Sequence, residues 1–209
     1  VSETVAEGII VDGLDEVKND GNENATERIS IQSFIAQLNP QLTSNDDGER
    51  YRATLLVSEI LRLKPTISVA PAALHLIILC FCQKLSDSAC LVPALDALNT
   101  LIVHHGYKLG SKYNDAYDIL ERLLKDVQVQ AMIQVIRQKA LDLTCVLLGH
   151  MSKTPTWSES IVGNVEILED MIALGDGEKD PRCLLLFLRI HKYVSYFNEC
   201  IKANEALQK

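Results

Sequence analysis

Aromatic residues are scarce in this chain: they make up 5% of its 209 residues, and there is a single tryptophan. The apolar fraction is nevertheless 47%. Leucine, isoleucine, valine and alanine must therefore fill any core, and a core of aliphatic side chains favours the packing of helices on helices.

Long hydrophobic runs are also missing. The longest apolar stretch, Val69–Cys82, has 14 residues and contains Pro71 and His75. A membrane-spanning helix needs about 20 residues, so we interpret this stretch as a buried helix and expect no membrane partner. The chain does not open with basic residues followed by an apolar run, so we expect no secretory signal.

Sequence motifs for catalysis are absent as well. There is no Gly-x-Ser-x-Gly, no glycine-rich phosphate loop and no His-Glu-x-x-His. These motifs are typical of hydrolases, nucleotide-binding proteins and zinc peptidases. Serine, histidine and aspartate are present but scattered. We therefore expect no enzymatic activity and no cofactor.

The chain has cysteines but no Cys-x-x-Cys, so the usual spacings of zinc and iron–sulfur ligands are missing. Cys80 and Cys82 would lie roughly 200° apart on a helix and could not face one cluster. We expect reduced cysteines in the core of an intracellular protein. Direct binding of a metal or a cluster remains an alternative hypothesis. The cysteines are Cys80, Cys82, Cys90, Cys145, Cys183 and Cys200.

The net charge of −8 is unevenly distributed. Residues 1–28 contain eight acids and two basic residues, a net charge of −6, which leaves −2 for residues 29–209. There is no basic stripe of the kind that nucleic-acid binding requires, so we expect no direct nucleic-acid partner. We predict that residues 1–28 form a partly disordered acidic lead with a possible short helix.

From residue 29 onward, apolar residues recur at helical spacing in pairs of segments joined by short polar turns. We expect outer helices over 31–39, 69–85, 113–125 and 161–172. We expect inner helices from Asp46 or Asp47 to Lys64 and over 91–105, 127–148 and 181–197. A Ser44–Asp47 capping box or Asp46 alone would begin the first inner helix, and Thr156 with Glu159 would begin the last outer helix.

Equivalent points on the inner helices fall near Arg52, Val92, Arg137 and Arg182, in steps of 40, 45 and 45 residues. This is the period of HEAT or armadillo-type repeats. Each such pair buries its apolar face only by stacking on its neighbour. The sequence therefore predicts an all-α fold, a right-handed α-solenoid of about four helix pairs over 29–198. Residues 199–209 would be a terminal segment that could begin a further repeat.

Three arginines recur at these equivalent points: Arg52, Arg137 and Arg182. They could bind an acidic partner. We favour an internal ladder, in which each arginine bonds to an acid or a carbonyl of the neighbouring repeat.

The charged turn before the last inner helix is the candidate partner-binding site. Asp180 suits a helix N-cap, and Pro181 suits the first helical position. Trp157 is a second candidate, because exposed tryptophans often anchor partners, although it could equally fill the layer between the third and fourth pairs. The candidate residues are Asp176, Glu178, Lys179, Asp180, Arg182 and Trp157.

Three segments of the chain are distinctive. They are the block Asp176–Arg182, followed by Leu184-Leu-Leu and Arg189-Ile-His191, and the segments around Arg50-Tyr-Arg-Ala and around His75-Leu-Ile-Ile-Leu. The first resembles a distinctive block of the MMS-nineteen family of HEAT-repeat proteins, and the other two are similar to the amino-terminal region of that family. The resemblance is collinear over about residues 30–196.

The resemblance implies a non-catalytic scaffold of the cytosolic iron–sulfur targeting complex. Its implied partners are the subunits of that complex and apo iron–sulfur clients such as DNA helicases and polymerases. The implied location is the cytoplasm and the nucleus. A HEAT-type cargo carrier is the alternative function.

Overall fold

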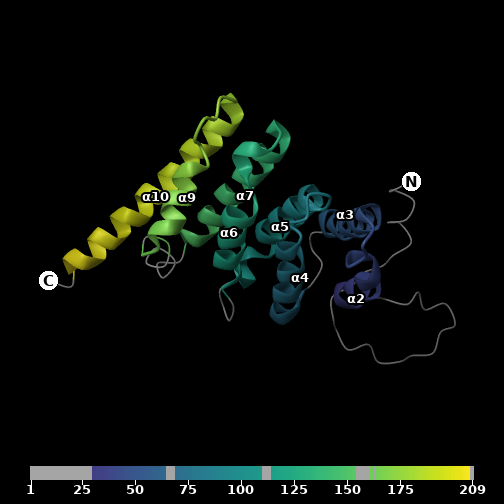
Figure 1. Ribbon diagram of the computed structural model, residues 1–209. Coiled ribbons are helices and arrows are strands. Elements are labelled where there is room, and N and C mark those ends of the chain that lie inside the picture. The colour runs from purple at the N-terminus through teal and green to yellow at the C-terminus, as the bar shows by residue number, and fades with distance from the viewer. Residues whose placement is uncertain (1–29, 65–68, 110–113, 154–160, 162, 208–209) are drawn as a thin grey trace. The chain divides into compact units, whose positions relative to one another are not determined.

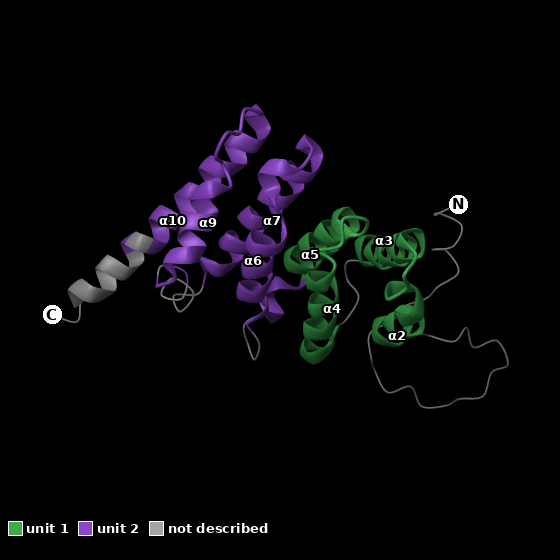
Figure 2. Ribbon diagram, viewed as in Figure 1, with its two compact units in different colours: residues 1–104 green, residues 105–209 purple. Residues whose placement is uncertain are grey.

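The structure is a computed structural model that describes residues 30–64, 69–109, 114–153, 161 and 163–207. Within these ranges every regular element is helical. The chain divides into two compact units, Val1–His104 and His105–Lys209, shown in Figure 2. The expected acidic lead over 1–28, the capping pair Thr156 and Glu159, and Trp157 lie outside the described residues.

The first unit is formed by two helix pairs, and its helices follow one another along the chain as labelled in Figure 1. An outer helix and an inner helix make each pair, and α2 packs on α3. These helices are α2 (Ile31–Leu42), α3 (Asp47–Leu63), α4 (Pro71–Gln83) and α5 (Leu91–His105).

The second unit repeats this plan. The inner helix α7 contacts both α6 and α10, and the outer helices α6 and α9 contact each other. The elements are η1 (Gly106–Lys108), α6 (Asp115–Asp126), η2 (Val129–Ala131), α7 (Gln134–Met151), α9 (Val165–Ala173) and α10 (Pro181–Leu207). The expected all-α class and the α-solenoid of helix pairs are thus confirmed for the described residues.

Polar side chains fix several helix starts. Asp46 accepts a hydrogen bond of 2.7 Å from the Glu49 amide at the start of α3. The Asn164 side chain accepts a hydrogen bond of 3.3 Å from the Ile167 amide at the start of α9. Asp180 accepts bonds from the amides of Arg182 and Cys183 at the start of α10. Each cap satisfies amides that have no partner within the helix. The predicted caps at Asp46 and Asp180 are confirmed.

The position of each helix explains its burial pattern. On α6, one face is fully buried and the opposite face is polar, as expected of an outer helix. On α7, Leu141, Leu143, Leu147 and Leu148 are all completely buried, although they point in several directions. This follows because α7 is covered on one side by α6 and on another by α10.

The predicted boundaries of three helices differ most from the structure. α2 continues through Pro40 to Leu42, because the Leu42 side chain is buried and the Thr43 hydroxyl and amide bond to the Asn39 carbonyl. α7 begins at Gln134 instead of residue 127 and continues through Gly149 to the fully buried Met151. α10 runs on to Leu207, through most of the segment that we set apart as 199–209.

The cysteines whose side chains are described carry free thiols, and all of them except Cys80 are buried. Burial raises the pKa of the Cys145 thiol to about 11, so this group stays protonated at neutral pH. The interpretation as core residues is confirmed for Cys82, Cys90, Cys145 and Cys183, whereas Cys80 is half-buried. Among the described residues, no three His, Cys, Asp or Glu side chains lie close enough to hold a metal ion. None of the described helices has the length and apolarity to cross a membrane.

Close packing between α9 and α10 leads to a stability prediction at Gly175. A Cβ atom at this position would collide with the Phe187 ring. We therefore expect Gly175→Ala to lower the free energy of unfolding by about 1–3 kcal/mol, the usual cost of overpacking. Urea unfolding of the two proteins measures the difference.

The control is Gly177→Asn in the same turn. Gly177 has a φ of 70° and open space around its Cβ position, and asparagine tolerates this conformation better than other residues with a side chain. This variant should stay near the wild-type stability. Equal stabilities of Gly175→Ala and the wild type would contradict the packing argument.

Candidate functional site

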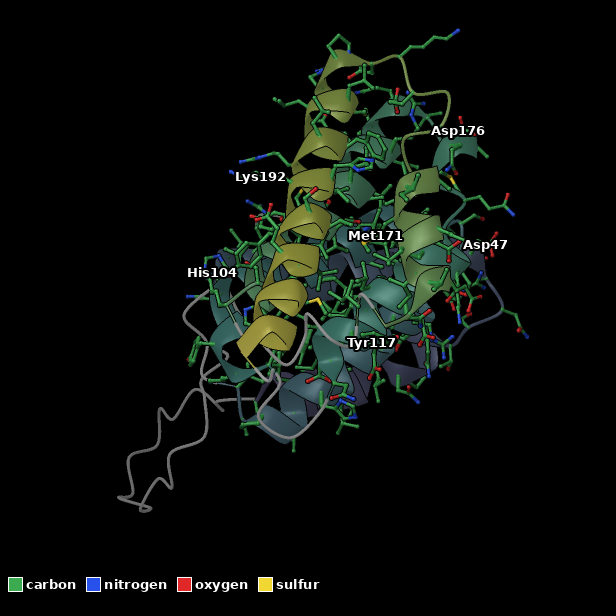
Figure 3. The ribbon with its side chains drawn as sticks, turned by 90° about the vertical axis from the view of Figure 1, so that its left-hand side faces the viewer. Asp47, His104, Tyr117, Met171, Asp176 and Lys192 are labelled. Carbon is green, nitrogen blue, oxygen red and sulfur yellow. The ribbon has the colours of Figure 1, made fainter. Side chains whose placement is uncertain are left out.

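The candidate site is the turn between α9 and α10. The Gly177 backbone lies in the left-handed region, with a φ of 70°, a conformation that glycine adopts at little cost. The turn reverses the chain between the two helices and brings the carboxylates of Glu178 and Asp180 towards the protein. Figure 3 labels Asp176 at this turn.

Glu178 forms a bridge to the preceding repeat. Its carboxylate accepts two hydrogen bonds from Arg137 on α7, of 2.7 and 3.0 Å. It also accepts bonds of 2.8 Å from the amides of Lys179 and Asp180. The Glu178 side chain is only 4% exposed. A buried carboxylate is costly unless it is paired and hydrogen-bonded, and here both of its oxygens are occupied.

These partners change the acidity of the group. The Arg137 guanidinium, helped by the two amides, lowers the pKa of Glu178 to about 2. The carboxylate is therefore charged at neutral pH. Because all of these partners belong to the protein, the role of the carboxylate is to hold the turn against α7.

The first unit contains the same bridge. Arg50 on α3 donates from Nε to Asp87, over 2.7 Å, and Asp87 lies in the turn before α5. Asp87 also accepts a bond from the Ala89 amide, and the Arg50 hydrogen bond lowers its pKa. Arg50 and Arg137 are each the fourth residue of their inner helix. We call these two interactions the inter-repeat bridges.

A second bond reinforces each of these two junctions. In the first unit the Lys84 ammonium donates to the Leu42 carbonyl at the end of α2. In the second unit the Gln130 side-chain amide donates to the Ala173 carbonyl at the end of α9. In both cases a side chain of one repeat satisfies a carbonyl at a helix end of the other.

The predicted arginine ladder is therefore partly confirmed. Arg137 bonds to the acid of the next repeat as expected. Arg52 was the wrong residue, because it is exposed and Arg50, two positions earlier, makes the bridge. Arg182 was also wrong, because it is 69% exposed and its ion pair, of 3.6 Å, is with Asp180 of its own turn.

The structure separates the predicted site residues into two groups. Glu178 holds the repeats together, and Asp180 caps α10 with a side chain that is 20% exposed. Asp176, Lys179 and Arg182 are exposed. We call these three the turn surface. Asp176 and Lys179 border an open recess of about 260 Å³ that also includes Gln130 and Leu174.

Sequence reasoning missed Arg50 and the bridging role of Glu178. A usable signal was present in both cases. Each bridging arginine is the fourth residue of an inner helix, and each bridging acid lies three or four residues before the next inner helix. Aligning the repeats on helix starts, instead of on arginines, would have paired Arg50 with Arg137.

The low pKa of Glu178 predicts how stability depends on pH. Because the pKa is below the usual 4.5 in the folded state, the unfolded state binds more protons between about pH 5 and pH 2. The bridge should therefore stabilise the fold fully above this window and lose its effect as the pH falls through it. Urea unfolding of the wild type and Glu178→Gln at several pH values measures this dependence.

We expect the wild type to be more stable than Glu178→Gln at pH 7 and the difference to shrink towards pH 2. Lys179→Gln, next to it on the turn surface, is the matched control and should follow the wild type at every pH. A difference between the wild type and Glu178→Gln that does not vary with pH would contradict the assignment.

Comparison with known proteins places these features in a family. The family model described as Dos2-interacting transcription regulator of RNA-Pol-II, an MMS19 amino-terminal model, matches residues 35–207. This range includes both inter-repeat bridges and the turn surface. No solved structure matches the chain.

Two curated relatives are described as MMS19 nucleotide excision repair protein homologs. The protein from Dictyostelium discoideum is 26% identical over 171 residues, which are 81% of this chain and 14% of the relative. The protein from Arabidopsis thaliana is 26% identical over 163 residues, which are 78% of this chain and 14% of the relative. The chain thus spans about one seventh of the length of these relatives.

Proposed function

The chain belongs to the MMS19 family, matching its amino-terminal region, and from this premise we propose that it is a non-catalytic scaffold that binds other proteins. Stacked helix pairs support this function, because solenoids present extended surfaces to partners. The turn surface supports it too, since its three charged residues take no part in the inter-repeat bridges.

The descriptions of the family and of the relatives support partners in DNA repair and transcription. The family model is described as interacting with Dos2 and as a regulator of RNA-Pol-II, and both relatives are described as nucleotide excision repair homologs. We propose that this chain contributes to contacts of the same kind.

More specifically, we propose a role in the cytosolic iron–sulfur targeting complex. The partners would be subunits of that complex and apo clients such as DNA helicases and polymerases, and the protein would act in the cytoplasm and the nucleus. The resemblance of the Asp176–Arg182 block to the MMS-nineteen family supports this finer proposal. The chain would position its partners without binding a cluster or nucleic acid itself.

The observation that carries the proposal is the collinear family match over residues 35–207 combined with the exposure of Asp176, Lys179 and Arg182. If every charged residue of the turn were needed for folding, none would remain exposed to contact a partner. Here the two acids needed for folding are buried or half-buried, and the three other charged residues face outward.

The test reverses the charges of the turn surface in the protein. We expect Asp176→Lys, Lys179→Glu and Arg182→Glu together to lower co-purification of the targeting-complex subunits or of an apo helicase by on the order of tenfold, about 1.4 kcal/mol. Circular dichroism should show an unchanged fold, because both bridge residues remain.

The matched control reverses Arg122 and Asp126, an exposed arginine and a half-buried aspartate on the outer helix α6 with an ion-pair distance of 3.6 Å. This control should bind like the wild type. Undiminished co-purification of every partner by the turn variant would contradict a docking role for the turn surface. Undiminished assembly after removal of residues 30–196 would contradict the scaffold function of the whole chain.

A further inference from the structure

A groove runs between the inner helices α7 and α10, which pack side by side. It is separate from the recess beside the turn and encloses about 470 Å³. Its lining includes Val135, Lys139 and Asp142 from α7 and Arg182, Leu185 and Leu186 from α10.

Three of the residues that line this groove are aliphatic. Leu186 is almost buried, whereas Val135 is 54% exposed and Leu185 is 62% exposed. Exposed aliphatic side chains that gather in a groove, bordered by polar residues, are typical of surfaces that bind other molecules.

This face is not the one that the repeats use for stacking. α10 covers α7 on the side of Cys145, whose thiol donates to the Leu186 carbonyl, and yet Val135 and Asp142 of α7 still line the groove. When α7 and α10 are aligned on their first residues, Val135 corresponds to Arg182 and Asp142 to Arg189. The face of α7 that carries Val135 and Asp142 therefore stays accessible after α10 has packed on α7. The equivalent face of α10 carries Arg182 and Arg189.

The charges around the groove are mainly positive. Arg182 and Arg189 lie within roughly 60° of Leu185 around the α10 axis, given 100° per residue, and both are exposed. Lys139 adds a third cation from α7. The acids beside these cations are Asp142 of α7 and Asp180, which pairs with Arg182 over 3.6 Å. Lys192, labelled in Figure 3, projects from α10 and extends the row of cations by another turn. This local excess is opposite in sign to the chain's net charge of −8.

We propose that the groove between α7 and α10 binds an acidic amphipathic helix of a partner protein. Its leucine-type side chains would pack on Val135 and Leu185, and its carboxylates would face Arg182 and Arg189. From Arg182 to Lys192, α10 rises about 15 Å, so a partner helix of about ten to twelve residues matches the length of the site. The inference rests on the scaffold function proposed above and names the chemistry of one partner.

The test uses the 209-residue chain and a fluorescein-labelled 14-residue peptide, with leucines on one face of its helix and glutamates on the other. A second peptide carries lysine in place of every glutamate, and a single-stranded DNA of 20 nucleotides serves as a purely polyanionic probe. Fluorescence anisotropy measures the binding of each probe at low and at physiological salt.

We expect the glutamate peptide to bind at least tenfold more tightly than the lysine peptide and to weaken as salt screens the charges. Arg189→Glu and Leu185→Ala should each weaken its binding on the order of tenfold, about 1.4 kcal/mol. Arg122→Glu on α6 changes the charge by the same amount away from the groove and should have no effect. Thermal unfolding should be unchanged in all three variants, because the substituted side chains are exposed.

Equal binding of the two peptides, equal effects of Arg189→Glu and Arg122→Glu, or binding of the DNA in place of the peptide would each overturn the proposal. Failure here is distinguishable from failure of the scaffold function. If the peptide does not bind while the complete protein still assembles with its partners, only the groove proposal fails. If the peptide binds but assembly with the partners does not change when residues 30–196 are removed, only the scaffold proposal fails.

Discussion

A partly buried ion pair between neighbouring repeats fixes the geometry of each unit. An inner helix such as α7 cannot bury its apolar surface alone and must share it with the next inner helix. Arg137 on one repeat and Glu178 on the next are joined by two hydrogen bonds across this junction, and Arg50 and Asp87 repeat the arrangement. Because both carboxylates also accept backbone amide bonds, each bridge fixes the shape of a turn as well as the contact between repeats.

The different roles of the charged residues in the turn between α9 and α10 follow from this constraint. Glu178 must point inward to meet Arg137, and Asp180 must point along α10 to cap it. The remaining charged residues then face solvent. One of the two bridges lies in each unit. Each unit thus contains two helix pairs joined by one bridge.

The sequence was sufficient for the helix pairs and for the cap at Asp180, because these depend on local patterns, and it left two alternatives for the cap of α3. The bridging role of Arg137 was predicted from the repeat period, because its partner lies 41 residues further along the chain. Proline at position 40 and glycine at 149 were misleading, since burial of Leu42 and Met151 extends both helices past them. Arg50 and Arg52 are indistinguishable by composition, and only the direction of α3 relative to Asp87 decides between them. The groove between α7 and α10 could not be predicted, because residues about 45 positions apart form it.

A double-mutant cycle on Arg137 and Glu178, with glutamine replacing each residue singly and together, tests the claim that this pair couples two repeats. The more exposed pair Arg122 and Asp126, within the single helix α6, provides the reference cycle. We expect a coupling energy for Arg137 and Glu178 that clearly exceeds the reference, because the Glu178 side chain is 4% exposed and fully hydrogen-bonded. Equal coupling energies in the two cycles would contradict the account.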